Sequence, residues 1–206
     1  MTKEAQLETL DQRLSYIVGE NMAHQLKNDG IELDTNAFAM AVADVVAGNQ
    51  PRLSEAEKRS AIEEIQKVSE ERQQAKHAAN IAEGAAYLEA NSKKDGVITT
   101  NSGLQYKSLA SGNGQKPTKS DTVKVHYKGT LIDGTPFDSS YDRGEPAVFP
   151  VGGVIAGWTE ALQLMSVGDK FELTIPSNLA YGPNGSGQAI GPNATLVFEV
   201  ELLGIE

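Results

Sequence analysis

Side chains that could do covalent or acid–base chemistry are sparse in this sequence. It has no cysteine, which excludes thiolate zinc sites and cysteine nucleophiles. Its three histidines, His24, His77 and His126, lie far apart along the chain and indicate no metal site. Residues 137–158 instead gather the only tryptophan and two of the five phenylalanines among glycine, proline, aspartate and serine. We expect no metal and no cofactor, and the question is what chemistry such apolar side chains can do.

The composition sets limits on the partners. The chain has 206 residues with a formal net charge of −10, which opposes nucleic acid binding because phosphates require a basic surface. No stretch reaches the roughly 20 apolar residues of a membrane span. The N-terminus carries charges every few residues and has no apolar signal-peptide core. We therefore expect a cytoplasmic protein, or a periplasmic one whose signal peptide is missing from this sequence.

The character of the sequence changes near Gly96. Five of the 20 glycines and one of the eight prolines precede this point, and the remainder follow it. The first part is therefore predicted to be helical, and the second to consist of strands and turns.

Three helices are predicted in the first part. The first has the spacing of an amphipathic helix over residues 7–26, with Gly30 as the residue that ends it. The second follows Asp34. Ser54 and Glu57 have the spacing of a capping box at the start of the third, which meets no glycine or proline before Glu83 and extends to about residue 92.

These helices differ in how apolar they are. Beyond Val68 the third has few large apolar residues, so we interpret it as a solvated spacer; the alternative is a helix that lies on the C-terminal domain through its alanine face. The first two have large apolar faces but are too small to build a core. We predict an isologous homodimer through residues 1–50, a linker helix over 51–96 and a separate domain over 97–206. Coverage of the two helices by that domain is the other interpretation.

The C-terminal part shows the alternation of antiparallel strands. Apolar and polar residues alternate over residues 121–132, 170–176 and 195–205, and 103–110 is a further candidate strand. Asp133 and Gly134 form a hairpin signal. Residues 157–168 are the one helical candidate. We predict an α+β fold, in which a twisted antiparallel sheet packs on one short helix.

The motifs "VHYKGTLIDGTPFDSS", "GVIAGWTEALQLMSVGDKFELTIP", "LAYG" and "NATLVFEVELL" resemble the FKBP family of peptidyl-prolyl cis-trans isomerases over about residues 100–206. The helical first part is similar to the dimerising extension of the bacterial macrophage infectivity potentiator (Mip)-like subgroup. The resemblance implies an FKBP-like fold and isomerisation of X–Pro bonds during protein folding. It also implies unfolded or proline-containing client proteins, chaperone-like binding by a V-shaped or extended dimer, and inhibition by rapamycin-type macrolides.

This activity needs no nucleophile. Rotation about an X–Pro bond breaks amide resonance, and the barrier is ~18–20 kcal/mol. The planar amide is strongly polar and the twisted one is less so. A dry apolar pocket therefore favours the twisted form, which is differential binding of the transition state.

The resemblance also implies the site residues. Those implied in catalysis are Asp138, Tyr127, Phe149, Tyr181 and Phe198; those implied in substrate binding are Phe137, Arg143, Val154, Ile155, Trp158 and Ile190. Trp158 would form the floor under the proline ring. The Ile155 N–H and the Tyr181 hydroxyl would donate to ligand carbonyls, and Arg143 would pair with Asp138. Taken alone, each aromatic is typical of a sheet core and Asp138 of a turn.

The sequence departs from the family pattern near the pocket rim, at Ala147, Ser186, Ala189 and Gly191. These positions leave macrolide affinity and substrate preference open. One rival interpretation is a non-catalytic binding module with the same fold. Another, compatible with catalysis, is a chaperone that holds unfolded chains between two arms. The glycine-rich stretches "GNGQ" and "GPNGSG" lack the lysine of a phosphate loop and are predicted to be plain loops.

Overall fold

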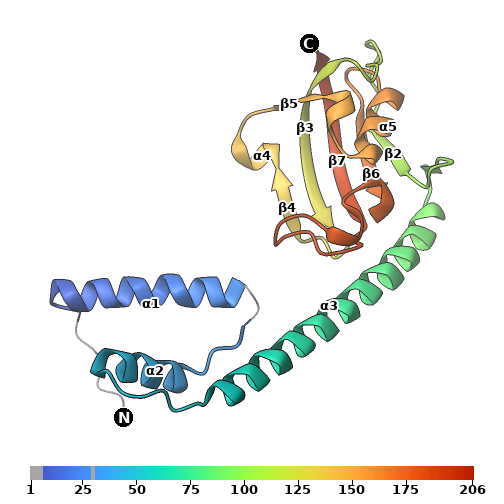
Figure 1. Ribbon diagram of the computed structural model, residues 1–206. Coiled ribbons are helices and arrows are strands. Elements are labelled where there is room, and N and C mark those ends of the chain that lie inside the picture. Colours follow the sequence, from blue (N-terminus) through green and yellow to red (C-terminus); the bar gives the residue numbers. More distant parts are fainter. Residues whose placement is uncertain (1–6, 29–30) are drawn as a thin grey trace. The chain divides into compact units, whose positions relative to one another are not determined.

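The computed structural model describes residues 7–28 and 31–206, and Gly30 lies outside them. The chain divides into two compact units, one that ends at Gln66 and one that starts at Lys67. The long helix α3 (Glu55–Ser92) crosses this boundary without interruption (Figure 1).

The first unit contains α1 (Leu10–Asn28), α2 (Thr35–Ala47) and the first turns of α3. Asp34 caps α2 through its carboxylate, and Gly48 ends it with a left-handed φ of 70°. The predicted capping box at the start of α3 is confirmed: Ser54 Oγ accepts from the Glu57 N–H at 3.3 Å, and Glu57 Oε2 accepts from the Ser54 N–H at 2.8 Å.

The apolar faces of the first two helices are open to solvent in the single chain. No residue of α2 is buried, and Val45 and Val46 are 80% and 83% exposed. Leu10 and Leu14 on α1 are exposed as well. Two short helices have therefore not built a core of their own, as their size predicts.

The second unit is built on a seven-stranded sheet whose strands pair antiparallel throughout. The strand order is β1-β2-β6-β7-β3-β4, with β5 also paired to β3. The strands are β1 (Val97–Thr99), β2 (Gln105–Ala110), β3 (Thr122–Leu131), β4 (Pro136–Ser139), β5 (Ala147–Pro150), β6 (Lys170–Ile175) and β7 (Leu196–Ile205). The three strands predicted from alternation (β3, β6 and β7) and the further candidate over residues 103–110 (β2) are confirmed, whereas β1, β4 and β5 were not predicted.

The turn between β3 and β4 is the predicted Asp-Gly hairpin. Gly134 has a φ of 87°, and the Leu131 N–H donates to the Thr135 carbonyl at 2.9 Å. Only a residue that tolerates positive φ closes the turn at this point, so the hairpin signal identified it correctly.

One helix, α5 (Ala156–Leu164), packs on one face of the sheet (Figure 1). Trp158, Ala161 and Leu162 of α5 are buried and belong to the same core as the inward residues of β3, β6 and β7. The short elements α4 (Ser140–Arg143), η1 (Val151–Gly153), η2 (Ser177–Leu179) and η3 (Gly182–Asn184) lie in the connections. The predicted α+β class is confirmed.

The C-terminal turns of α3 also belong to this unit. Asn91 Nδ2 donates to Gln105 Oε1 at 2.9 Å and to Thr174 Oγ1 at 3.1 Å, and Gln105 Nε2 donates to the Leu88 carbonyl at 2.9 Å. Gly84 and Asn91 are buried. The expectation of a solvated helix beyond Val68 is therefore wrong for these turns. The alternative interpretation, in which the helix contacts the C-terminal domain, is correct for these turns. The contact is made by Gly84 and by the amides of Asn91 and Gln105.

Candidate functional site

A cavity of about 530 Å³ opens between α5, the sheet and the loops that follow β5 and β6. Its walls are mostly aromatic and aliphatic, with one carboxylate. It is lined by Tyr127, Phe137, Asp138, Phe149, Gly153, Val154, Ile155, Trp158, Tyr181, Ser186, Ala189, Ile190 and Phe198. A cavity of this size and lining suits a small apolar group with a few polar attachments.

Trp158 forms the centre of an aromatic box. The rings of Tyr127, Phe149 and Phe198 each meet it edge to face, at centroid distances of 5.2, 5.8 and 5.3 Å. Phe137 in turn meets Phe198 edge to face at 5.5 Å. Perpendicular contacts of this kind are favourable and fix each ring plane. The rings of the box therefore support one another without a ligand.

Two glycines allow the box to close. A Cβ on Gly129 would lie 2.6 Å from Phe137 and 2.7 Å from Phe198, so the rings occupy the space above this residue of β3. A Cβ on Gly157 would lie 2.5 Å from Ile175. The missing side chain of Gly157 lets α5 approach β6 closely, and this approach places Trp158 at the base of the cavity.

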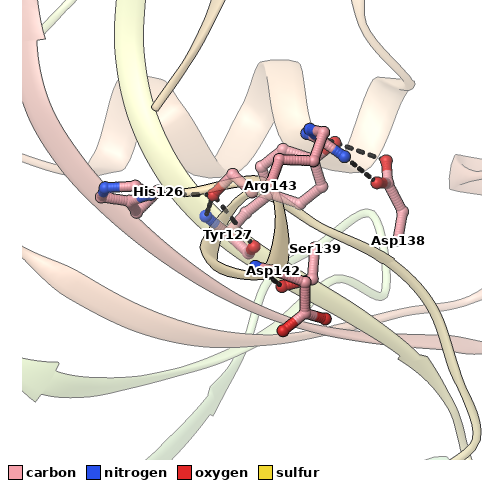
Figure 2. Close-up of polar contacts among 7 residues, drawn as sticks. His126, Tyr127, Asp138, Ser139, Asp142 and Arg143 are labelled. Atoms are coloured by element: carbon pink, nitrogen blue, oxygen red, sulfur yellow. Dashed lines mark hydrogen bonds and ion pairs between the residues drawn. The ribbon is translucent and has the colours of Figure 1, made fainter. Parts of the chain in front are cut away.

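Tyr127 and Asp138 of the cavity wall belong to a polar cluster, whose contacts Figure 2 shows. Asp138 accepts hydrogen bonds from the Tyr127 hydroxyl and from Arg143 Nη1. Arg143 Nη2 also donates to the Tyr127 hydroxyl at 3.0 Å, and its guanidinium lies 5.5 Å from the centroid of that ring. The three side chains form a closed triangle, so none of them can turn without breaking two contacts.

These contacts determine the protonation states of Asp138 and Tyr127. Burial alone would raise the pKa of Asp138, but the hydrogen bonds from Tyr127 and Arg143 outweigh it and hold the pKa below the ordinary 3.8. Burial and the Asp138 hydrogen bond raise the pKa of Tyr127 above 10.0. At neutral pH the cluster is therefore a carboxylate, a neutral phenol and a guanidinium.

The short helix α4 positions Arg143. Ser139 is its N-cap and accepts the Asp142 N–H at 3.2 Å, while Gly144 ends it with a φ of 77°. Buried Ser140 ties the helix to β3, because its Oγ accepts the Tyr127 N–H at 2.8 Å and hydrogen-bonds to His126 Nδ1 at 2.9 Å. The interpretation of Asp138 as a turn cap is wrong, since Ser139 has that role and Asp138 lies in β4.

Comparison with known proteins identifies the family. Residues 113–203 match the model of the FKBP-type peptidyl-prolyl cis-trans isomerase domain, and residues 11–107 match that of the domain amino-terminal to it. The FKBP-type 22 kDa peptidyl-prolyl cis-trans isomerase of Escherichia coli is 48% identical over 96% of this chain and 97% of its own length. The chain belongs to the FKBP-type peptidyl-prolyl cis-trans isomerases.

Other members of this family cover both units. The outer membrane protein MIP of Legionella longbeachae is 43% identical over the whole of this chain and 90% of its own. The crystal structure of FkpA from Escherichia coli matches with a TM-score of 0.71 and 39% identity, over 97% of this chain and 98% of that one. The protein is therefore an FKBP-type isomerase with the amino-terminal domain attached. In the part of the chain that the structure describes, no helix is long and apolar enough to cross a membrane.

The structure brings the expected FKBP site residues together. Ten of the eleven line the cavity, and Arg143 stands behind Asp138 and contacts it. Of the rim departures, Ser186 and Ala189 line the cavity, whereas Ala147 lies in β5 opposite Val125 and Gly191 adjoins Ile190. Gly153 was missed. Its backbone, at the end of η1, forms part of the wall, and a glycine gives no sequence signal for that. Among residues 7–28 and 31–206, no three His, Cys, Asp or Glu side chains cluster as a metal site.

Proposed function

We propose that the aromatic cavity is the site where this isomerase binds an X–Pro segment and rotates its amide bond. The observation that carries the proposal is the set of three rings packed around Trp158, with an ionised Asp138 beside them. The proline ring would lie on Trp158. The residues Tyr127, Phe149 and Phe198 would enclose it and exclude water.

The geometry accounts for catalysis without a covalent step. A planar amide loses hydration when it enters the cavity, and the less polar twisted amide loses less. The difference lowers the rotation barrier, which is ~18–20 kcal/mol in water. The Ile155 N–H, at the start of α5, and the Tyr181 hydroxyl, at the rim, would orient the neighbouring carbonyls. They would thereby hold the X–Pro segment so that its amide bond lies in the apolar part of the cavity and is free to rotate.

Asp138 is assigned a positioning part in this scheme. Its carboxylate is occupied by Tyr127 and Arg143, so it is poorly suited to proton transfer. It holds the Tyr127 ring upright against Trp158 and places a fixed negative charge beside the rotating amide. Loss of the carboxylate would free the phenol and the guanidinium together.

The test is isomerisation of a short X–Pro peptide by full-length variants. Phe149→Ala and Asp138→Ala are each expected to lower kcat/KM at least several-fold with the fold retained, as circular dichroism would check. Val148→Ala and Asp142→Ala are matched controls, because Val148 is an exposed neighbour on β5 and Asp142 is not among the cavity residues. Wild-type activity in both test variants would show that the site lies elsewhere.

We further propose that the first unit makes a homodimer that serves client proteins. The exposed apolar faces of α1 and α2 support it, as does the match of residues 11–107 to the domain that precedes FKBP isomerases. An isologous pairing would cover these faces. A client that contacts two arms would meet each catalytic cavity at a raised effective concentration.

The full chain and residues 67–206 should therefore differ in the refolding of a protein substrate and agree in the isomerisation of a short peptide. The shorter form starts at residue 67, where the second unit begins, so that it keeps the part of α3 that contacts the sheet and the following loops. We expect nearly equal kcat/KM on a short peptide, and a clear loss for the shorter form on refolding of a proline-limited protein. Equal activity on the refolding protein would contradict the client proposal and leave the isomerase site untouched.

Two finer assignments follow from the same site. Rapamycin-type macrolides are proposed to compete with peptide, since they offer an apolar ring flanked by carbonyls; a competition assay measures this. The compartment is proposed to be the periplasm, which the name of the Legionella relative as an outer membrane protein favours, with the cytoplasm as the alternative. Fractionation of cells that produce the protein distinguishes the two.

A further inference from the structure

The loop of residues 182–195, which we call the flap, forms one rim of the cavity. It contributes Ser186, Ala189 and Ile190 to the lining. The Asn193 N–H donates to the Gly182 carbonyl at 2.9 Å, and Ser186 and Ile190 exchange two backbone hydrogen bonds of 2.9 and 3.1 Å. These bonds fix the shape of the flap, but they do not fix its position over the cavity.

The position is set by contacts with α3. Asn80 Nδ2 donates to the Pro192 carbonyl at 2.7 Å, and His77 Nδ1 lies 3.4 Å from Asn193 Nδ2. One turn further on, Gly84 is buried against Thr195, where a Cβ would lie 2.5 Å from Thr195 Oγ1. Positions 77, 80 and 84 lie on one face of a helix. This face of α3 runs along the base of the flap.

Gly191 makes the approach possible. A Cβ at this position would lie 3.1 Å from Lys76 Cε and 3.2 Å from Asn80 Nδ2. With a larger residue at 191, either the flap or the asparagine would have to move. The side chains of α3 thus occupy the space beside Gly191.

Packing between α3 and the flap is loose around Asn80, so it does not replace this hydrogen bond. Around Asn80 a cavity of about 120 Å³ separates α3 from the flap and the β3–β4 turn. Lys76, Glu83 and Gly191 are among its lining residues. Where side chains do not interlock, a directional bond decides where the loop lies. The Asn80 amide is the shortest such contact between the helix and the flap.

We propose that Asn80 is a positioning residue for the isomerase. From α3 it fixes the Pro192 carbonyl, two residues from Ile190, and so sets the distance of Ala189 and Ile190 from the bound peptide. The helix is then part of the support of the substrate site as well as a connection between units. The proposal rests on the assignment of the aromatic cavity as the isomerase site.

The test is steady-state kinetics of the full chain with an X–Pro peptide. For Asn80→Ala we expect KM to rise roughly two- to tenfold, the range of one net hydrogen bond, with kcat within about twofold of wild type. Alanine is the better helix former, so weakening of α3 would not explain a loss. Asn80→Asp keeps the size but turns a carboxylate toward the Pro192 carbonyl, and should raise KM at least as much.

Gln74→Ala is the matched control, because Gln74 is exposed on the same helix. A titration of Trp158 fluorescence with the peptide gives the affinity independently of turnover. A second variant, Gly191→Ala, crowds Asn80 from the flap side. It should raise KM in the wild type and less so in the Asn80→Ala background, since two changes at one contact do not add.

A role in stability alone would lower the unfolding temperature of Asn80→Ala and leave KM and peptide affinity at wild-type values. That result would overturn the proposal. Phe149→Ala, measured alongside, distinguishes failure of the flap proposal from failure of the isomerase-site assignment. Lost activity in Phe149→Ala with a wild-type KM in Asn80→Ala refutes only the flap proposal, whereas full activity in Phe149→Ala refutes the site itself.

Discussion

The two units of this chain treat the same kinds of side chain in opposite ways. In residues 67–206 the valines and leucines of the inner sheet face are fully buried under α5, and the apolar surface that stays open is shaped into a cavity. In the first unit Val45 and Val46 are almost fully exposed, and α2 buries no residue. A concave cavity can select a small group. An open helical face requires a second surface of similar size, which the proposed homodimer would supply.

The largest effect is expected where the open face is broken. The double variant Val45→Asp and Val46→Asp places two charges on the face of α2 and should convert the proposed dimer fully to monomer. Light scattering of the full chain should then give half the wild-type mass. Peptide isomerisation should be unchanged, because the cavity belongs wholly to the other unit.

The exposed polar residue Gln25 on α1 offers a control, and Gln25→Glu should leave the mass of the dimer unaltered. A wild-type chain that is monomeric at micromolar concentration would contradict the proposed homodimer. The apolar faces of α1 and α2 would then need another explanation.

A smaller effect tests whether the C-terminal part of α3 packs against Thr195 within the second unit. Alanine at a helical glycine normally stabilises by roughly 1 kcal/mol. At Gly84 the added methyl would lie 2.5 Å from Thr195 Oγ1, and overpacking costs ~1–3 kcal/mol, so Gly84→Ala should lower the free energy of unfolding. In a Thr195→Ala background the clash is relieved, and the same change should become neutral or stabilising. Urea unfolding of the four variants measures the cycle. A stabilising Gly84→Ala in the wild type would mean that α3 does not press on Thr195.

The smallest effect concerns pH. The folded pKa of Asp138 is lowered by Tyr127 and Arg143 despite its burial, so the stability it contributes is present above the ordinary carboxyl pKa of 3.8. That contribution is lost only as the pH falls through the lower folded value. The kcat/KM profile should accordingly stay level from neutral pH down to about 3.8. Arg143→Leu should move the acid limb upward. An acid limb above 3.8 in the wild type would show that Asp138 is not held as described.

Much of the fold could be predicted from the sequence because the long elements repeat one pattern. Alternation over β3, β6 and β7 and the capping box at Ser54 are local signals that tertiary contacts leave unchanged. The short strands β1, β4 and β5 have three or four residues, too few for a period to show. They form because β2 and β3 offer edges to pair with.

The docked end of α3 was missed for a different reason. Hydrophobic periodicity detects large apolar residues, but this contact uses a buried glycine at 84 and a buried amide at Asn91. A glycine inside an otherwise strong helical sequence was the available clue, since it costs stability unless a neighbour needs the space. The site residues could be named because the family motifs carry them in order. The triangle of Asp138, Arg143 and Tyr127 needed the fold, because β3, β4 and α4 supply one member each.

The position of β7 in the sheet has a consequence for synthesis. This strand comes last along the sequence, yet it pairs with both β6 and β3 at the middle of the sheet and carries Phe198 into the aromatic box. The bond from Asn80 to Pro192 likewise joins positions 112 residues apart. While the ribosome is still adding β7, the nascent chain has α1, α2 and α3, which can form from local contacts, but it has neither a continuous sheet nor a closed cavity. Each copy therefore becomes an isomerase only after β7 has emerged. Its own site cannot catalyse isomerisation of the chain's eight X–Pro bonds while that chain is first folding.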